Sequence, residues 1–346
     1  MFEKIEREMN KYDGLNYITK EISNYRYDLA NLCKYGMVLL GPDSFMQNES
    51  LCIIEFFEKK GFEIVDVCFK RLSKTQTENL FLPTSTCTKC GDLKWWMIQD
   101  SAEQGAFCAV LFYCDDADNE NHCLKRLNAF KGTSNPLDNS TGVVRYDYEA
   151  INVCLNLIHI PDTYGDFFKD TSPFYKVKEI VEIIHNREIT RQHIKNKFFK
   201  MKLMLRTGEK YIFELVLYKV KFNIASLLDD EHNLFDYYQN QYEWFHKEKN
   251  RKKRNIKLKK NIEFEMASIK DLEDILINKI RLEHETERLY RLIDKMNILR
   301  ILKAFTSPDI YKKYERDIYI ELRGYGLIIE EFERLILNTS LIQWKN

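Results

Sequence analysis

A histidine that follows a short apolar run is the clearest candidate in this sequence for a residue that does chemistry. His159 comes directly after residues 153–158, which are apolar except for Asn156, and Pro161 with Asp162 ends the run. A histidine at the end of such an element can face a cleft. Because its ordinary pKa is about 6.5, it could act as a nucleophile, a metal ligand or a general acid or base. The alternative is a histidine satisfied by local hydrogen bonds.

Two other groups of side chains could hold a metal ion. Cys87 and Cys90 form a C-x-x-C pair, to which Cys114, His122 and Cys123 could add zinc ligands. The sequence contains no second C-x-x-C, so free thiols are the favoured interpretation of this group. Carboxylates that could bind Mg²⁺ through oxygen lie close together in the next polar stretch: Asp115, Asp116 and Asp118. A solvated acidic loop is the commoner outcome for such a cluster.

A basic stretch at residues 247–260 could bind nucleic acid. It follows an aromatic-rich stretch at 230–245, and the two together could contact phosphates and stack on bases. An exposed helix face or a linker would show the same pattern. The whole chain carries 53 basic and 53 acidic residues, so no overall field attracts nucleic acid, and the second interpretation is favoured.

Composition limits where the protein works and how many domains it has. The 346 residues suffice for about two domains. No apolar run approaches the roughly 18 residues that a membrane span needs, and the first 14 residues are charged rather than signal-like. All nine cysteines lie in the first 154 residues, and their odd number and apolar surroundings favour reduced thiols. These features predict a soluble cytoplasmic protein with two domains of different kinds and no membrane partner.

The alternation of apolar runs and turn residues predicts the elements that position His159. Four strands are expected, at residues 35–40, 62–72, 106–114 and 152–158. Helices are expected between them, at residues 48–60, 92–104 and 124–132, with residues 73–92 irregular. The order of strands and helices predicts an α/β protein of the α+β kind, in which helices pack on a sheet of about four strands in split βαβ fashion.

The flanking segments are predicted to be mainly helical. Residues 1–34 form a helical extension, residues 35–171 the α/β domain, and residues 172–346 a mainly helical C-terminal domain. Within that last domain, residues 209–222 read as a strand pair or a helix. Residues 266–305 carry leucine and isoleucine at helical spacing, which predicts one long amphipathic helix suited to a bundle or to self-association.

Three blocks of sequence resemble the nucleoside diphosphate kinases. Residues 38–62, VLLGPDSFMQNESLCIIEFFEKKGF, resemble the family's first strand, K-P-D-G turn, helix and lysine-glycine-phenylalanine end. Residues 132–147, GTSNPLDNSTGVVRYD, resemble G-x-T-N-P-x-x-S-x-P-G-T-I-R-G-D. Residues 155–162, LNLIHIPD, resemble R-N-I-I-H-G-S-D. The blocks follow the family's order, and the resemblance covers residues of about 35–170.

The resemblance implies a ferredoxin-like domain that passes phosphate between nucleotides through a phosphohistidine. It implies that His159 takes the phosphate, that Asn156 lies beside it and that Asp170 orients it. It also implies Mg²⁺ as cofactor, with Asp162 in the region that binds the metal–phosphate end. Contacts to nucleoside di- or triphosphates, including an aromatic cover for the base, are implied for a further set: Arg145, Ser134, Asn135, Arg126, Trp95 and Trp96.

The chain departs from the family pattern at four positions. Gly41 replaces a lysine, and Asn128 replaces a phosphate-binding arginine, with Arg126 two residues out of register. Ile160 and Pro161 replace a glycine and a serine. Phosphoryl transfer depends on positioning and charge stabilisation, and the loss of one such donor costs on the order of 100- to 1,000-fold in rate. These replacements argue against an efficient housekeeping kinase.

Three functional interpretations remain open. The first is phosphoryl or nucleotidyl transfer on nucleoside triphosphates at the His159 pocket, in a regulatory or signalling role. The second is a catalytically inactive nucleotide sensor that regulates a partner protein, with the C-terminal helices contacting that partner or a second copy of the chain. The third, less favoured, is nucleic-acid binding through residues 247–260.

Overall fold

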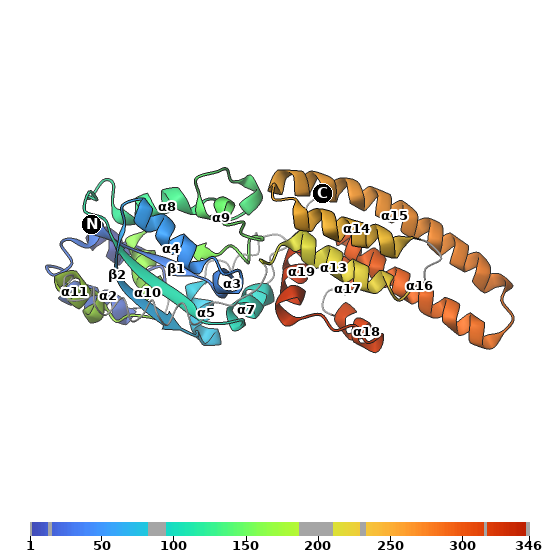
Figure 1. Ribbon diagram of the computed structural model, residues 1–346. Helices are drawn as coiled ribbons and strands as arrows, with labels where there is room; N and C mark the ends of the chain where they lie inside the picture. Colours follow the sequence, from blue (N-terminus) through green and yellow to red (C-terminus); the bar gives the residue numbers. More distant parts are fainter. Residues whose placement is uncertain are drawn as a thin grey trace. The chain divides into compact units, whose positions relative to one another are not determined.

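The computed structural model describes residues 2–12, 16–81, 95–186, 210–228, 233–314 and 317–343. The chain divides into two compact units, Met1–Lys210 and Tyr211–Asn346. In Figure 1 they run from blue to green and from yellow to red. No helix in the described parts of the chain is both long and apolar enough to cross a membrane.

The first unit is built on a four-stranded antiparallel sheet. Its strands are β1 (Tyr35–Leu40), β2 (Glu63–Lys70), β3 (Phe107–Tyr113) and β4 (Ile158–His159), in the order β2-β3-β1-β4 (Figure 1). Every residue of β1 and β3 is buried, as expected for central strands covered on both faces. The predicted α+β fold with a ferredoxin-like sheet is confirmed.

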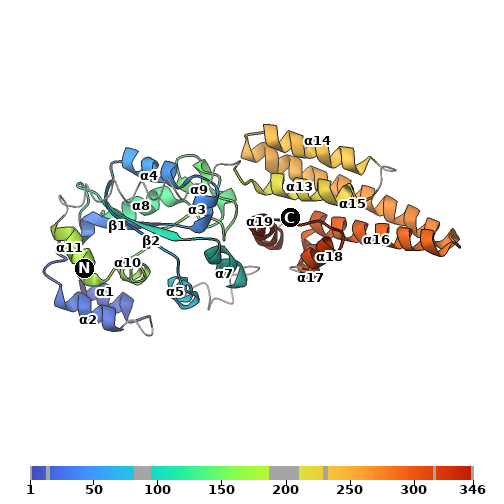
Figure 2. The ribbon, with the colours of Figure 1, turned by 60° about the horizontal axis from the view of Figure 1, so that its bottom comes forward.

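Helices cover both faces of this sheet. Figure 2 shows α4 (Ser50–Lys59) and α8 (Cys123–Lys131) on one side, and α10 (Tyr164–Thr171) on the other. Helix α1 (Phe2–Met9) packs against α10, and α2 (Asn16–Asn24) packs against α11 (Val177–His185). The shorter helical segments of the unit are η1 (Leu32–Lys34), α3 (Pro42–Met46), α5 (Lys74–Leu80), α7 (Trp95–Glu103), η2 (Pro136–Asp138) and α9 (Val144–Asp147).

Two local predictions for this unit are wrong. Residues 74–80, expected to be irregular, form α5, whose N-terminus is stabilised by a capping box between Ser73 and Gln76. The strand expected at 152–158 is reduced to Ile158 and His159. The backbone of Leu157 has φ +69°, outside the strand region, and its N–H donates to Asp43 Oδ2 at 2.7 Å, so the extended conformation cannot continue toward residue 152.

The second unit is mainly helical among its described residues, as predicted. Its helices are α13 (Phe213–Ala225), α14 (Leu234–Lys247), α15 (Arg251–Leu282), α16 (Thr286–Thr306), α17 (Pro308–Tyr314), α18 (Ile318–Gly324) and α19 (Glu331–Gln343). For residues 209–222 the sequence leaves a strand pair or a helix open, and the residues from Phe213 onward form α13. The single long helix predicted over 266–305 is wrong. The chain turns back after Leu282, and α15 and α16 pack as a hairpin (Figure 1).

The interior of the second unit contains a charged pair. Lys221 Nζ donates to Glu265 Oε2 at 2.5 Å, and both side chains are fully buried. Glu265 also accepts hydrogen bonds from the hydroxyls of Tyr218, at 2.6 Å, and Thr306, at 3.3 Å. Asn261 in turn donates to the Tyr218 hydroxyl. The ion pair is therefore surrounded by hydrogen-bond partners inside the helical unit.

Candidate functional site

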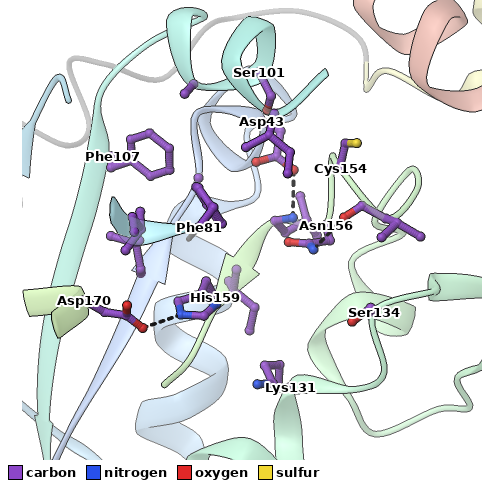
Figure 3. Close-up of a pocket in the computed structure, with 18 of the residues that line it drawn as sticks. Asp43, Phe81, Ser101, Phe107, Lys131, Ser134, Cys154, Asn156, His159 and Asp170 are labelled. Carbon is purple, nitrogen blue, oxygen red and sulfur yellow. Dashed lines mark hydrogen bonds and ion pairs between the residues drawn. The ribbon is translucent and has the colours of Figure 1, made fainter. Parts of the chain in front are cut away.

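A cavity of about 810 Å³ opens in the first unit around His159 (Figure 3). Residues from several parts of the chain line it: the turn after β1, the end of α5, the middle of α7, the end of α8, and α10. Apolar side chains such as Phe81, Ile98 and Phe107 form one part of the wall, and charged side chains form another. The cavity therefore combines an apolar surface with ionic groups, as ligand pockets commonly do.

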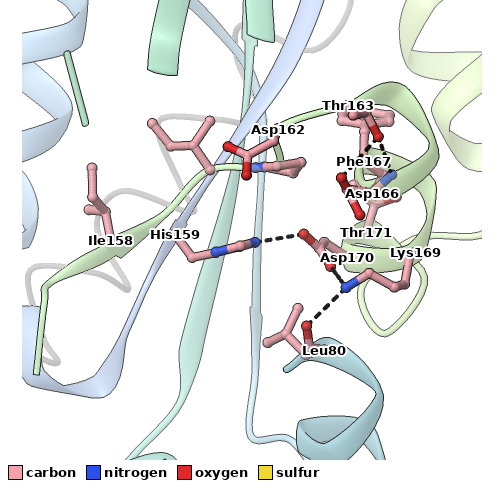
Figure 4. A network of polar contacts seen from close by, with 12 residues as sticks. Leu80, Ile158, His159, Asp162, Thr163, Asp166, Phe167, Lys169, Asp170 and Thr171 are labelled. Carbon is pink, nitrogen blue, oxygen red and sulfur yellow. Dashed lines mark hydrogen bonds and ion pairs between the residues drawn. The ribbon is translucent and has the colours of Figure 1, made fainter. Parts of the chain in front are cut away.

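His159 is oriented by a buried carboxylate. Its Nε2 lies 2.6 Å from Asp170 Oδ2, and Asp170 is only 1% exposed. The other carboxylate oxygen of Asp170 accepts from Lys169, whose Nζ also donates to the Leu80 carbonyl at 2.9 Å (Figure 4). Burial alone would raise the pKa of Asp170, but His159 and then Lys169 outweigh it and lower that pKa. An ionised carboxylate can only accept, so Nε2 carries a proton, and in the neutral ring this leaves the lone pair on Nδ1.

A second buried carboxylate shapes the turn beside His159. Asp43 is 4% exposed, and burial raises its pKa to about 6 in spite of its hydrogen bond from Leu157. The same turn is closed by a hydrogen bond from Gly41 N to Leu157 O at 2.9 Å. A Cβ placed on Gly41 would lie 2.4 Å from Asp43 Oδ1. A lysine at position 41, as in the family motif, would therefore require the Asp43 carboxylate to move.

Arg145 lies in the cavity wall with its guanidinium largely buried. It donates to the carbonyls of Gly132, at 3.1 Å, and Ile158, at 2.9 Å, and is 4% exposed. Its Nε finds no hydrogen-bond partner among the residues that the structure describes. Burial lowers the pKa of Arg145 to about 10, although Asp43 and Asp162 oppose the effect. The group remains charged at neutral pH and adds positive potential to the cavity.

Lys131 is a second cation in the wall, at a position to which the family motifs give no role. Its Nζ donates to the Ile160 carbonyl and to Asp162 Oδ1, both at 2.9 Å. Burial lowers the pKa of Lys131, while Asp162 acts against that shift. One signal for this residue was available: Lys131 stands three positions after Asn128, which places both on the same face of a helix.

Six of the residues proposed from the sequence line this one cavity. They are His159, Asn156, Asp170, Arg145, Ser134 and Asp162. Figure 3 shows His159 and Asn156 on one strand-like segment, with Ser134 across from them. Asn156 donates from Nδ2 to the Val153 carbonyl at 2.9 Å. Segments far apart in sequence thus meet as the motifs predicted, and the chemical role of each residue stays a prediction.

Four of the proposed nucleotide contacts are not among the residues lining the cavity. Asn135 caps η2 by accepting from Leu137 N, and its Nδ2 donates to Asp138. Trp95 and Trp96 are half-buried at the start of α7, although Ile98 and Ser101 further along that helix do line the cavity. The fourth is Arg126, on α8. The nucleotide contacts proposed for these residues stay predictions.

The alternative metal sites gain no support from the described residues. Cys87 and Cys90 lie outside them. Cys114 and Cys123 are buried, and burial raises the pKa of both thiols. His122 accepts from Lys125 N at the start of α8. Within the described ranges, no group of three or more His, Cys, Asp and Glu side chains is placed to hold a metal ion, which includes the acidic stretch 115–118.

The basic stretch 247–260 runs from the last residue of α14, through the connection at residues 248–250, into the first turns of α15. Arg254 is buried, donates to the carbonyls of Glu248 and Lys249, and lies 3.8 Å from Glu214. Lys252, Lys253, Lys259 and Lys260 are exposed. One of the basic residues therefore has a structural role, and nucleic-acid binding by the others stays a prediction.

Comparison with known proteins places a family domain around this cavity. Residues 34–180 match the family model described as nucleoside diphosphate kinase. The nucleoside diphosphate kinase of Fervidobacterium nodosum is 26% identical over 145 residues, which cover 42% of this chain and 90% of that protein. Human nucleoside diphosphate kinase B is 26% identical over 160 residues, covering 44% and 93% of the two chains. A crystal structure of the Aquifex aeolicus nucleoside diphosphate kinase aligns with 42% of this chain and 97% of that one, at 13% identity and a TM-score of 0.36.

The matched region contains the whole sheet and His159, Asp170 and Arg145. Helices α1 and α2 and the second unit lie outside it. The resemblance read from three motifs is thus confirmed as a domain-level relationship.

Proposed function

We propose that the nucleoside diphosphate kinase-like domain at residues 34–180 binds nucleoside triphosphates and transfers their terminal phosphoryl group through His159. The observation that carries this proposal is the 2.6 Å contact between His159 Nε2 and the buried Asp170 carboxylate. It sits in a cavity that also contains the cations Arg145 and Lys131. A histidine fixed at one nitrogen beside positive charge is suited to take up a phosphoryl group at the other.

The proposed reaction has two steps. In the first, His159 Nδ1 attacks the γ-phosphorus of a nucleoside triphosphate, and the bond from that phosphorus to the bridging oxygen breaks. A nucleoside diphosphate leaves, and a nitrogen–phosphorus bond forms. Asp170 stabilises the positive charge that develops on the ring while Nε2 keeps its proton. In the second step, a terminal oxygen of another nucleoside diphosphate attacks that phosphorus and releases Nδ1.

Mg²⁺ would enter this site together with the triphosphate. The described residues offer no group of three ligands that could hold the ion alone. Asp162 lies on the cavity wall with its side chain 78% exposed and can offer a carboxylate oxygen. The ion, when bound, would neutralise charge on the phosphate oxygens.

The turn at Gly41 favours slow rather than efficient turnover. Residue 41 is a glycine where the family motif has a lysine, so this turn supplies no cation, and a side chain there would require Asp43 to move. We therefore propose a regulatory or signalling role over a housekeeping one. The same observation favours a second candidate: a sensor that binds nucleotide, does not turn it over, and acts on a partner protein.

Labelled triphosphates separate these candidates. The full-length protein is incubated with Mg²⁺ and either γ-³²P- or α-³²P-labelled ATP or GTP, and protein-bound label is measured. His159→Ala is compared with His185→Ala, because His185 also faces a carboxylate, Asp28, at 3.2 Å but is exposed and outside the cavity. We expect γ-label on the wild type and on His185→Ala, and none on His159→Ala. Transfer of α-label would instead identify a nucleotidyl transferase, and nucleotide binding without any label would identify the sensor.

A further inference from the structure

We propose that Lys131 is the cation that holds the transferred phosphoryl group, one helical turn beyond the position where the family motif places an arginine. This inference rests on the proposed transfer at His159 and names a residue that the motifs do not assign. Lys131 would then supply, three residues further along α8, the positive charge that the family motif places at position 128.

The position of Lys131 ties it to the segment that carries His159. Lys131 is the last residue of α8, and its Nζ donates to the carbonyl of Ile160, the residue directly after His159, at 2.9 Å. It also donates to Asp162 Oδ1 at 2.9 Å. Lys131, His159 and Ser134 all line the cavity (Figure 3). A phosphoryl group on His159 would therefore form beside this ammonium group.

Asn128 serves a different purpose in this chain. Its Nδ2 donates to the carbonyls of Pro161, at 2.7 Å, and Leu124, at 3.1 Å, and Asn128 is not among the residues that line the cavity. Asn128 therefore links α8 by a hydrogen bond to the segment that follows His159. Arg126, two residues earlier, is likewise absent from the lining. Asn128 holds the segment in place, and Lys131, on the same helix face, supplies the charge.

The other two cations of the described cavity wall are less exposed than Lys131, whose side chain is 15% exposed. Arg145 donates to two carbonyls and is 4% exposed. Lys169 is 4% exposed and is bound to Asp170 and to the Leu80 carbonyl. An ammonium group has three N–H donors, and the two protein acceptors of Lys131 leave one for a phosphate oxygen. The Asp162 side chain is 78% exposed, so a phosphate oxygen could also displace it from Lys131.

The test compares variants of Lys131 in the full-length protein. Lys131→Met removes the charge, Lys131→Arg keeps it, and Lys125→Met removes a charge from the same helix outside the cavity. We measure the rate of His159 phosphorylation at saturating ATP with Mg²⁺, the affinities for AMP-PNP and AMP by calorimetry, and the thermal unfolding temperature. Lys131→Gln provides a second uncharged variant if Lys131→Met does not fold.

We expect Lys131→Met to lower the phosphorylation rate by on the order of 100- to 1,000-fold. We also expect it to weaken AMP-PNP binding at least about tenfold without changing AMP binding, because AMP lacks the γ-phosphate. Lys131→Arg should stay within about tenfold of the wild-type rate, and Lys125→Met should match the wild type. Wild-type phosphorylation together with an unchanged Lys131→Met rate would overturn the inference. If the wild type is not phosphorylated, the proposed transfer fails, and an unchanged AMP-PNP affinity in Lys131→Met would then overturn the role of Lys131 as well.

Discussion

Each unit of this protein buries a lysine–carboxylate pair, and the two pairs differ in the exposure of the groups that are hydrogen-bonded to them. In the first unit, Asp170 is bound by Lys169 and by His159, and the His159 side chain is 32% exposed on the cavity. In the second unit, Glu265 is bound by Lys221 and by Tyr218 and Thr306, and all of these side chains are buried. The network around Asp170 therefore reaches the cavity through His159, whereas these groups around Glu265 are buried.

The difference suggests that one kind of buried ion pair can support either a reactive site or the packing of helices. Burying two charges is costly, and hydrogen bonds to the remaining donors and acceptors offset that cost. In the helical unit the bonds from Lys221, Tyr218 and Thr306 are buried, and half-buried Tyr237 of α14 adds a longer one at 3.4 Å. This network holds α13, α14, α15 and α16 together. Around Asp170 the network ends at a histidine ring that still has one nitrogen to offer. We infer that the first pair serves chemistry and the second pair serves folding, and the following predictions test that division.

The largest expected effect is on the stability of the helical unit. Lys221→Met leaves the Glu265 charge buried without its ion-pair partner, and we expect a loss of about 3–5 kcal/mol in the free energy of unfolding of that unit. Urea denaturation followed by circular dichroism measures it. The double variant Lys221→Met/Glu265→Gln, which removes the orphaned charge but keeps an acceptor for Tyr218, should recover most of the loss. A loss below about 1 kcal/mol in the single variant would show that this pair does not stabilise the fold.

Asp170→Asn should slow phosphorylation, and it also costs stability because it removes the charge partner of the buried Lys169. An asparagine side chain can accept a hydrogen bond from His159 Nε2 through its oxygen or donate one to it through its amide. The ring can then carry its proton on either nitrogen, so the lone pair is no longer held on Nδ1. We expect the rate of His159 phosphorylation to fall on the order of 100- to 1,000-fold, about 3 to 4 kcal/mol in the activation barrier. Rapid-quench assays with γ-labelled ATP measure this rate. An unchanged rate would place Asp170 with Glu265 among the purely structural carboxylates.

A third carboxylate, Asp43, should make the stability of the folded protein depend on pH in the opposite sense to Asp170. Burial raises its pKa in the folded protein to about 6, from an ordinary value of 3.8. The folded state therefore binds this proton more tightly. The resulting stability is complete below about pH 4 and is lost as the pH rises through about 6. For Asp170, whose pKa is lowered, the contribution is instead lost as the pH falls.

The comparison with Asp43→Asn isolates this contribution. Between about pH 4 and pH 7, the stability of the wild type relative to Asp43→Asn should fall by about 2 to 3 kcal/mol, because each tenfold change in proton affinity corresponds to about 1.4 kcal/mol. Urea denaturation of both proteins across this range measures the difference. A difference that is independent of pH would contradict the protonation of buried Asp43.

Much of the fold could be predicted because its signals are local. Apolar runs bounded by turn residues marked β1 to β3, and α5 could have been found too, since Ser73 and Gln76 have the spacing of a capping box. The length of β4 could not be read this way. The residue that ends it, Leu157, is held by Asp43 from 114 positions away in the sequence. The break between α15 and α16 falls at residues 283–285, which contain neither glycine nor proline.

The site was predictable where it follows family motifs and not where the chain departs from them. The motifs predicted that His159, Asp170 and Arg145 lie together, and all three line the one cavity, from β4, α10 and α9 respectively. They could not show Lys131, because its contacts to Ile160 and Asp162 depend on how α8 packs beside that segment. The family resemblance also implies that Trp95 or Trp96 covers the base, but neither residue is among those that line the cavity.

The most direct test of the account is to locate the phosphate on the protein. After incubation with ATP and Mg²⁺, the protein is digested under alkaline conditions, which preserve phosphohistidine, and the peptides are analysed by tandem mass spectrometry and ³¹P NMR. We predict one phosphate on His159, bonded to Nδ1, because Asp170 holds Nε2. Phosphate on Nε2 of His159, on another residue, or on no residue of a protein that binds ATP would contradict it.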